Sequence, residues 1–272
     1  MTTAPPKIIV AFSAGTDSTT AAYYYRKLGY QVTLAVFDDG ACNDPLGPLY
    51  DPNKPKDLTN FSDEFYDYVR IHQEHTEGHL QFDFVEIRYP QLALLEANKT
   101  AKPGRDNAAA AEADGLGFWV GFKGLMAMLL MSHGAANGYE AVVFGHMPYN
   151  NHYEDELPQN FELLRQYMVT AYGSRVEIPQ IYHPFYRPNF DTKEKVIELA
   201  QAIGVPLRDT YSCRRGEVET RGILLPLLRG GNSNYVSPTY RWKHCGTCEN
   251  CVERKRAFAA LGMKDPAPYM EH

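Results

Sequence analysis

The sequence predicts an α/β protein with a doubly wound parallel sheet and a small cysteine-bearing segment at its C-terminus. Two observations support this fold class. Short runs rich in β-branched residues alternate with helical patterns as far as residue 205. Three of the five cysteines then fall close together, between residues 245 and 251. We therefore expect an α/β domain over residues 1–205 and a C-terminal segment, residues 206–272, packed on it.

The strands of the predicted sheet are short. Residues 7–12 form an apolar, β-branched run that is too short for a helix, so we expect a buried central strand there. One helix separates it from the next strand, which gives a right-handed parallel unit. The remaining strands are expected at residues 31–37, 82–87, 141–144 and 178–182.

Helices are expected between these strands. The first covers residues 19–28, with Thr16, Asp17 or Ser18 as its N-cap. Thr192 is the expected N-cap of the helix over residues 192–203. Further helices are expected at residues 61–76, 89–98, 116–137 and 156–171, and the glycines that end helices are Gly29, Gly138 and Gly204.

Composition and charge narrow the function classes. The net charge of −6 argues against a broad basic surface for nucleic acid, although it is compatible with a local basic patch. The most apolar stretch, residues 116–131, is interrupted by glycines and Lys123, so we expect a buried helix rather than a membrane span. The N-terminus shows no signal peptide, and five cysteines in such a chain indicate a reducing compartment. We expect a cytoplasmic protein without membrane or nucleic-acid partners.

A loop of small residues joins the first strand to the first helix. Loop amides and the positive end of the helix dipole converge there, which makes an anion site suited to phosphates. Asp17 is the first candidate to reach Mg²⁺, directly or through water. A generic Ser/Gly turn is the alternative interpretation. The residues expected to cradle the phosphates are Ser13, Gly15, Thr16, Asp17 and Ser18, and Phe12 and Ala14 are also expected to bind the nucleotide.

Other candidates lie where further strands end, because open α/β sheets bind ligands at that edge. Phe37 and Asp38 are placed to meet the adenosine half of a nucleotide, although a plain strand-end turn is as good an interpretation of Asp38. Gly145 follows the fourth strand, and residues 145–156 are the expected substrate wall. Lys123 is a candidate cation, or a snorkelling side chain at a helix start. The residues expected to read the ligand are Tyr149, Asn150, His152, Glu154 and Asp155, although a solvated polar loop would look the same.

The clustered cysteines have the spacing C-x2-C-x2-C, at Cys245, Cys248 and Cys251, and Cys213 is the only plausible fourth ligand. Four thiolates in tetrahedral geometry suit a structural Zn²⁺ ion, and a closed site leaves no position for catalysis. Zinc would tie the C-terminal tail to the segment after the helix at residues 192–203. A disulfide pair and an iron–sulfur cluster are the alternatives. Cys42, alone in a polar stretch, is expected to be an ordinary residue.

The loop at residues 13–18 resembles the pyrophosphate loop, S-G-G-x-D-S, of the ATP pyrophosphatase superfamily, whose members cleave ATP between the α and β phosphates. No Gly-Lys-Ser/Thr follows, so it is not a Walker A loop. Ala14 stands where that superfamily has its first glycine. A methyl group is tolerable at this position if the residue keeps a negative φ.

The loop together with Thr210-Tyr211-Ser212-Cys213 and the stretch from His244 to Arg254 resembles the 7-cyano-7-deazaguanine synthase family. The resemblance implies a Rossmann-like fold of the adenine nucleotide alpha hydrolase type, a four-cysteine zinc site and a homodimer. It implies a carbon–nitrogen ligase of queuosine biosynthesis that uses ATP and ammonia to turn 7-carboxy-7-deazaguanine into the nitrile. The acid and then the amide are adenylated, AMP and pyrophosphate leave, and ammonia attacks directly. The expected catalytic residues are Asp17, Ser18 and Lys123.

The chain departs from the family's pattern where the substrate should bind. Residues 120–123 replace a Pro-Gly-Arg-Asn turn, residues 153–158 replace Gly-Tyr-Pro-Asp-Cys-Arg, and residues 214–244 form an insertion. These departures favour a relative with the same adenylating core and another amine acceptor, in DNA modification or antiphage defence. An RNA-thiolating enzyme of the superfamily and a non-catalytic nucleotide-binding protein are also compatible with the sequence.

Overall fold

The computed structural model describes residues 4–38, 82–88, 122–148, 158–213, 217–220 and 240–270. The helices expected at residues 61–76 and 89–98 lie outside these ranges, as does Cys42. None of the helices in the described ranges combines the length and the apolar character that crossing a membrane requires.

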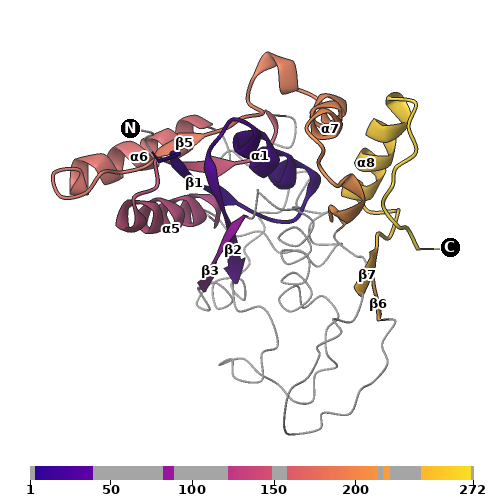
Figure 1. The fold of residues 1–272 in the computed structure, drawn as a ribbon, viewed down its shortest axis with the longest axis horizontal. Coiled ribbons are helices and arrows are strands. Elements are labelled where there is room, and N and C mark those ends of the chain that lie inside the picture. Colours follow the sequence, from indigo (N-terminus) through magenta and orange to yellow (C-terminus); the bar gives the residue numbers. More distant parts are fainter. Residues whose placement is uncertain are drawn as a thin grey trace, which may run out of the picture.

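A five-stranded parallel sheet forms the centre of the fold (Figure 1). Its order is β3-β2-β1-β4-β5, so the chain runs outward from β1 in one direction and then in the other. This arrangement confirms the predicted doubly wound sheet, and it places the topological switch point between β1 and β4. The strands are β1 (Lys7–Ala11), β2 (Gln31–Asp38), β3 (Asp83–Arg88), β4 (Ala141–Phe144) and β5 (Gln180–Tyr182).

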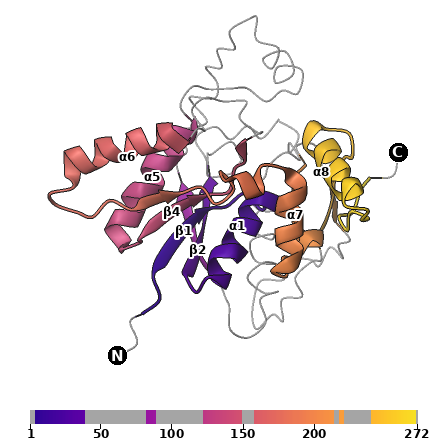
Figure 2. The ribbon, with the colours of Figure 1, turned by 90° about the horizontal axis from the view of Figure 1, so that it is seen from above.

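Helices cover both faces of the sheet (Figure 2). On one face, α1 (Thr16–Lys27) and α7 (Lys193–Ala202) pack on the side chains of Ile8 and Val10. On the other face, α5 (Phe122–Asn137) and α6 (Pro158–Tyr172) pack on Ile9. Adjacent residues of β1 therefore serve opposite cores, as expected of a strand buried on both faces.

The first helix differs from the prediction. It begins at Thr16 rather than Thr19, and its N-cap is Gly15, which supplies no side-chain cap. The predicted capping by Thr16, Asp17 or Ser18 is therefore wrong, because these residues already form the first turn. The prediction for α7 is confirmed, since the Thr192 hydroxyl accepts the amide of Lys195 at 3.4 Å. The predicted helix ends are also confirmed, with positive φ at Gly29, Gly138 and Gly204.

The C-terminal segment contains elements that the sequence did not predict. The helix α8 (Glu249–Ala260) packs on α7 through Ala257 and Phe258, and α7 lies between α1 and α8 (Figure 2). Two strands from the insertion, β6 (Glu217–Thr220) and β7 (Tyr240–Lys243), pair as an antiparallel sheet. Two short 3₁₀ helices, η3 (Pro188–Phe190) and η4 (Leu207–Asp209), flank α7.

Candidate functional site

The loops that follow β1 and β4 meet at the switch point of the sheet. A Cβ atom added to Gly145 would lie 2.9 Å from the backbone oxygen of Asp17 and from the Cα atom of Ser18. Only glycine fits at such a distance, because any side chain would push the first turn of α1 away. The predicted proximity of Gly145 to residues 13–18, here called the phosphate loop, is therefore present in the structure.

The phosphate loop turns sharply at Ala14. This buried residue has φ +52°, so the condition under which a methyl group is tolerated without strain is not met. The Ala14 carbonyl accepts the amide of Tyr211 at 2.8 Å, which holds the turn from outside the loop. An L-residue in this region is strained and needs such support.

Two serines close the loop on itself. The Oγ atoms of Ser13 and Ser18 lie 3.1 Å apart, and the Ser13 amide donates to Ser18 Oγ at 3.2 Å. Ser13 is exposed, whereas Ser18 is buried and also donates to the Gly15 carbonyl at 3.3 Å. The amides of Asp17 and Ser18 lie in the first turn of α1, where no intrahelical acceptor exists. Open amides beside an exposed hydroxyl suit an anionic ligand.

Thr16 contributes to the loop in a different way from the prediction. Its side chain is buried, and its Oγ1 atom accepts from Arg254 Nη1 at 2.9 Å and lies 3.1 Å from Ser212 Oγ. Both partners come from the C-terminal segment. The Thr16 hydroxyl is thus engaged in holding the loop, while Phe12 is buried in the core and donates its amide to Ala35.

Asp17 forms an ion pair that the sequence did not predict. Its Oδ1 atom lies 2.6 Å from Nζ of Lys193, the first residue of α7, and the lysine side chain is 6% exposed. Glu253 of α8 belongs to the same charged group: burial raises its pKa, the Lys193 charge lowers it and the Asp17 charge raises it. Three elements thus place two carboxylates and one ammonium beside the phosphate loop.

The remaining nucleotide and substrate candidates are less concentrated. Phe37 packs into the core under α5 and α6, and Lys123 lies half-buried in the first turn of α5. Asp38 ends β2, and its side chain lies outside the described part. The five residues expected to read the ligand are also outside it: Tyr149, Asn150, His152, Glu154 and Asp155.

Two histidines lie at the same edge of the sheet: His146 falls within the substrate wall expected at residues 145–156, whereas His183 was missed. His146 follows β4 and His183 follows β5, with ring centroids 4.9 Å apart. The His183 ring stacks on Phe161 at 5.3 Å, and burial lowers its pKa to about 4, which keeps it neutral at neutral pH. Their places directly after strands were the signal that sequence reasoning had available.

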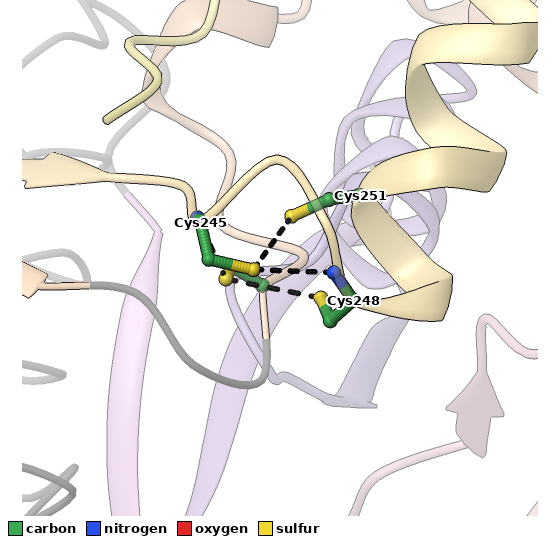
Figure 3. Close-up of side chains that lie close together, drawn as sticks. Cys245, Cys248 and Cys251 are labelled. Atoms are coloured by element: carbon green, nitrogen blue, oxygen red, sulfur yellow. Dashed lines mark hydrogen bonds between the residues drawn. The ribbon is translucent and has the colours of Figure 1, made fainter. Parts of the chain in front are cut away.

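Four cysteines form a compact, buried group, here called the cysteine cluster: Cys213, Cys245, Cys248 and Cys251. Figure 3 shows the side chains of Cys245, Cys248 and Cys251 close together. All four Sγ atoms lie within 4.8 Å of one another. The pairs Cys213–Cys248 and Cys245–Cys251 are 3.9 and 4.0 Å apart. Sulfurs bound tetrahedrally to Zn²⁺ at about 2.3 Å would lie about 3.8 Å apart. The cluster therefore fits zinc, Cys213 is confirmed as its fourth member, and its cysteines are free rather than disulfide-bonded.

Backbone amides support the cysteine cluster. The amides of Cys245 and Cys248 donate to the sulfurs of Cys213 and Cys245 at 3.2 and 3.3 Å. Burial raises the pKa of the Cys245 thiol, but hydrogen bonds that include those from the Thr247 and Cys248 amides lower it by more. The pKa of this thiol is therefore lowered overall. The pKa of Cys251 is raised by its hydrogen bonds with Cys213 and Cys248. Four crowded sulfurs cannot all ionise without a cation, so the cluster suits a metal ion.

The fold and this site together define a class of protein: a doubly wound α/β protein with a loop suited to anions at its switch point and a group of four cysteines that fits a metal ion. The family model described as queuosine biosynthesis protein QueC matches residues 105–262, a range that includes the whole cysteine cluster. Because this match covers more than half of the chain, the chain belongs to the QueC family.

Full-length comparison agrees with this family. A 7-cyano-7-deazaguanine synthase from Methanococcus maripaludis is 24% identical over 97% of this chain and 99% of the relative. One from Halobacterium salinarum is 26% identical over 97% and 96%. The synthase 2 of Sulfurisphaera tokodaii is 24% identical over 97% of this chain and 48% of the relative, so this chain spans about half of that protein.

Two solved structures resemble the chain distantly. One is described as a predicted subunit of tRNA methyltransferase from Methanocaldococcus jannaschii, with TM-score 0.40, 14% identity and coverage of 72% of this chain and 74% of that chain. The other is NMN synthetase from Francisella tularensis, with TM-score 0.36, 15% identity and coverage of 75% and 63%.

Proposed function

We propose that this protein is an ATP-dependent carbon–nitrogen ligase of the 7-cyano-7-deazaguanine synthase type. It adenylates the carboxylate of 7-carboxy-7-deazaguanine, releases pyrophosphate, and passes the acyl group to ammonia with release of AMP. A second adenylation, on the amide, then leads to the nitrile. The named relatives support the substrate, and membership of the QueC family supports the class of reaction.

One observation carries the proposal: the phosphate loop lies at the switch point, where the amides of Asp17 and Ser18 have no intrahelical acceptor and an ion pair lies beside them. An adenylating enzyme must hold the β and γ phosphates while a carboxylate attacks the α phosphorus in line. The amides of Asp17 and Ser18 and the Ser13 hydroxyl are donors suited to these phosphates. No side chain of the chain has to act as a nucleophile, because the carboxylate and the ammonia are both substrates.

The ion pair of Asp17 and Lys193 gives the site two charges of opposite sign. In our proposal Lys193 Nζ neutralises phosphate charge as ATP binds, and Asp17 becomes free to hold Mg²⁺ directly or through water. When bound, Mg²⁺ supplies charge neutralisation on the phosphates. The residues assigned to catalysis are thus Asp17, Ser18 and Lys123, as the sequence predicted, with Lys193 added.

The cysteine cluster has a structural role in this proposal. We propose that Zn²⁺ occupies it and holds the C-terminal segment against the α/β domain, since four protein ligands leave no open position. We also propose a cytoplasmic homodimer.

A second candidate is a relative that adenylates the same kind of carboxylate but joins it to another amine, as in nucleic-acid modification or antiphage defence. The observation that favours it is the strand pair β6 and β7. This pair lies in the insertion between Cys213 and Cys245, where the family has only a short turn.

One incubation tests both candidates. The protein is mixed with ATP, Mg²⁺, ammonia and 7-carboxy-7-deazaguanine, and AMP, pyrophosphate, amide and nitrile are measured by mass. We expect all four products, and Asp17→Asn should slow pyrophosphate release by about a hundredfold or more. Asp191→Asn is the matched control, because Asp191 is an exposed carboxylate paired with Lys195. Absence of AMP would contradict the ligase proposal, and AMP without amide would favour the second candidate.

A further inference from the structure

Arg254 is the largest fully buried side chain of the described residues, and it lies on α8 three positions after Cys251. Its Nε and Nη2 atoms donate to the two carboxylate oxygens of Asp265 at 2.8 and 3.0 Å. This bidentate pair supplies the counter-charge that a buried guanidinium requires.

The other hydrogen bonds of the guanidinium are with residues that lie earlier in the chain than α8. Nη1 donates to Thr16 Oγ1 at 2.9 Å and to Thr210 Oγ1 at 2.6 Å, and Nη2 donates to the Leu207 carbonyl at 2.8 Å. Arg254 and Thr16 are 238 positions apart in the chain. One side chain therefore joins the helix that carries Cys251 to the first residue of α1 in the phosphate loop.

A second connection to the same loop starts beside Cys213. Ser212 Oγ lies 3.1 Å from Thr16 Oγ1, and the Tyr211 amide donates to the Ala14 carbonyl at 2.8 Å. Ala14 has φ +52°, a conformation that persists only where the surroundings fix it. The segments that carry Cys213 and Cys251 thus contact both sides of Gly15.

The contacts that Arg254 makes within the C-terminal segment do not explain its contact with Thr16. The Asp265 carboxylate already balances the Arg254 charge, and Thr210 and Leu207 already accept from both Nη atoms. The contact with Thr16 lies instead at the start of α1, directly before the amides of Asp17 and Ser18, which have no intrahelical acceptor.

We propose that Arg254 is a positioning residue for the nucleotide site, which acts through Thr16 Oγ1. It fixes the start of α1, so that the amides of Asp17 and Ser18 are preorganised for phosphates before ATP arrives. The inference rests on the proposed function in taking ATP as the ligand.

The sharpest variant is Thr16→Val, because it removes the acceptor and keeps the shape and β-branching of threonine. We expect the Kd for Mg²⁺-ATP to rise at least about tenfold, which corresponds to about 1.4 kcal/mol. Thr16→Ser keeps the hydroxyl, so its Kd for Mg²⁺-ATP should equal that of the wild type. Zinc content should stay at the wild-type value in both variants, since neither change touches the cysteine cluster.

Arg254→Lys tests the other end of the contact. Lysine keeps the charge but cannot reach Asp265, Thr210 and Thr16 together, so ATP binding should weaken as in Thr16→Val. The double variant should bind ATP only slightly more weakly than either single variant, because both changes remove the same contact between Arg254 and Thr16. The matched control is Arg256→Lys, since Arg256 lies exposed on the same helix, and it should bind ATP as the wild type does.

Hydrogen exchange separates this inference from the proposed function. In Arg254→Lys we expect faster exchange of the amides of residues 13–18, with or without ATP. A folded, zinc-loaded Arg254→Lys protein with wild-type exchange in this loop would overturn the inference. Wild-type ATP affinity in folded Thr16→Val would overturn it as well. A wild-type protein that binds no ATP would refute the proposed function, and the exchange rates would still decide the role of Arg254.

Discussion

The phosphate loop and the cysteine cluster are built in opposite ways. The loop is one continuous stretch, residues 13–18, formed where β1 passes into α1, and it relies on backbone amides. The cluster brings together sulfurs from both sides of an insertion, with Cys213 and Cys245 32 positions apart. Neither region is complete by itself, because the loop is held by Tyr211, Ser212 and Arg254, which all flank cluster cysteines.

This difference separates two kinds of stability. A loop made by a strand and a helix takes its position from the sheet, whereas in our proposal the cluster depends on a metal to hold distant segments together. If the loop also needs the cluster, damage to the cluster should reach the nucleotide site. Damage to the loop should leave the metal in place.

The largest effect is expected from Cys251→Ser, which removes one of the four sulfurs. We expect bound zinc to fall from about one per chain to nearly none, and the free energy of unfolding to fall by about 4 kcal/mol or more. Metal analysis and denaturant unfolding measure the two effects. The control is Cys42→Ser, which changes the one cysteine outside the cluster. Iron and sulfide in the wild-type protein would contradict the zinc assignment and favour a thiolating enzyme.

Asp265→Asn should have the next largest effect, because it leaves the buried Arg254 guanidinium without a counter-charge. We expect the free energy of unfolding to fall by about 3 kcal/mol. Burial raises the pKa of the Asp265 carboxyl, but the opposite effect of Arg254 and Tyr269 is larger in total. The pKa therefore lies below 3.8 in the folded state. This part of the stability is complete above pH 3.8 and is lost as the pH falls through the folded pKa.

Urea unfolding of the wild type and of Asp265→Asn, followed from about pH 6 to about pH 2.5, checks this prediction. The difference between the two proteins should shrink at the acid end. Asp191→Asn is the control, since its exposed ion pair with Lys195 should shift the midpoint little. A constant difference at every pH would argue that Asp265 matters through shape rather than charge.

His183, which follows the outermost strand β5, provides a second pH-dependent comparison. Its pKa is lowered from 6.5 to about 4 by burial, so the unfolded state binds more protons between these values. Stability is therefore complete above pH 6.5 and falls as the pH drops toward 4, by about 2 kcal/mol at about pH 5. His183→Phe and His183→Gln should both remove this dependence in urea unfolding. Parallel acid curves for variants and wild type would contradict it.

The smallest effect is expected from Ala14→Gly. Glycine relieves an L-residue at φ +52°, a gain of about 1–2 kcal/mol. It also removes a buried methyl and adds freedom to the unfolded chain, which together cost about 1–2 kcal/mol. Thermal unfolding should therefore show a change in stability of less than about 1 kcal/mol. A large gain would show that the support from Tyr211 does not offset the strain.

The structural features that depend on residues close together in the chain could be predicted from the sequence. The strands, the Thr192 cap and the cysteine set follow from β-branched runs, a capping hydroxyl and metal-ligand spacing. The helix α8 was missed because the cysteine spacing dominated the interpretation of residues 245–260. The start of α1 was predicted wrongly and the positive φ of Ala14 was not predicted, since both depend on partners near residue 211.

The pairs that complete the candidate site could not be predicted. Asp17 and Lys193 are 176 positions apart, and a single sequence carries no signal that joins them. The same holds for Thr16 and Arg254. Local patterns locate such residues on elements, but only the packing of α7 and α8 beside α1 brings the side chains together.

The most direct test of the account is nucleotide binding measured along a metal titration. A chelator removes zinc from the full chain in steps, zinc is then restored, and bound metal and ATP affinity are measured at each step. We predict that the fraction of chains binding ATP with wild-type Kd follows the fraction carrying zinc, in both directions. Metal-free protein that binds ATP with unchanged affinity would contradict the claim that the cysteine cluster holds the phosphate loop in its binding conformation.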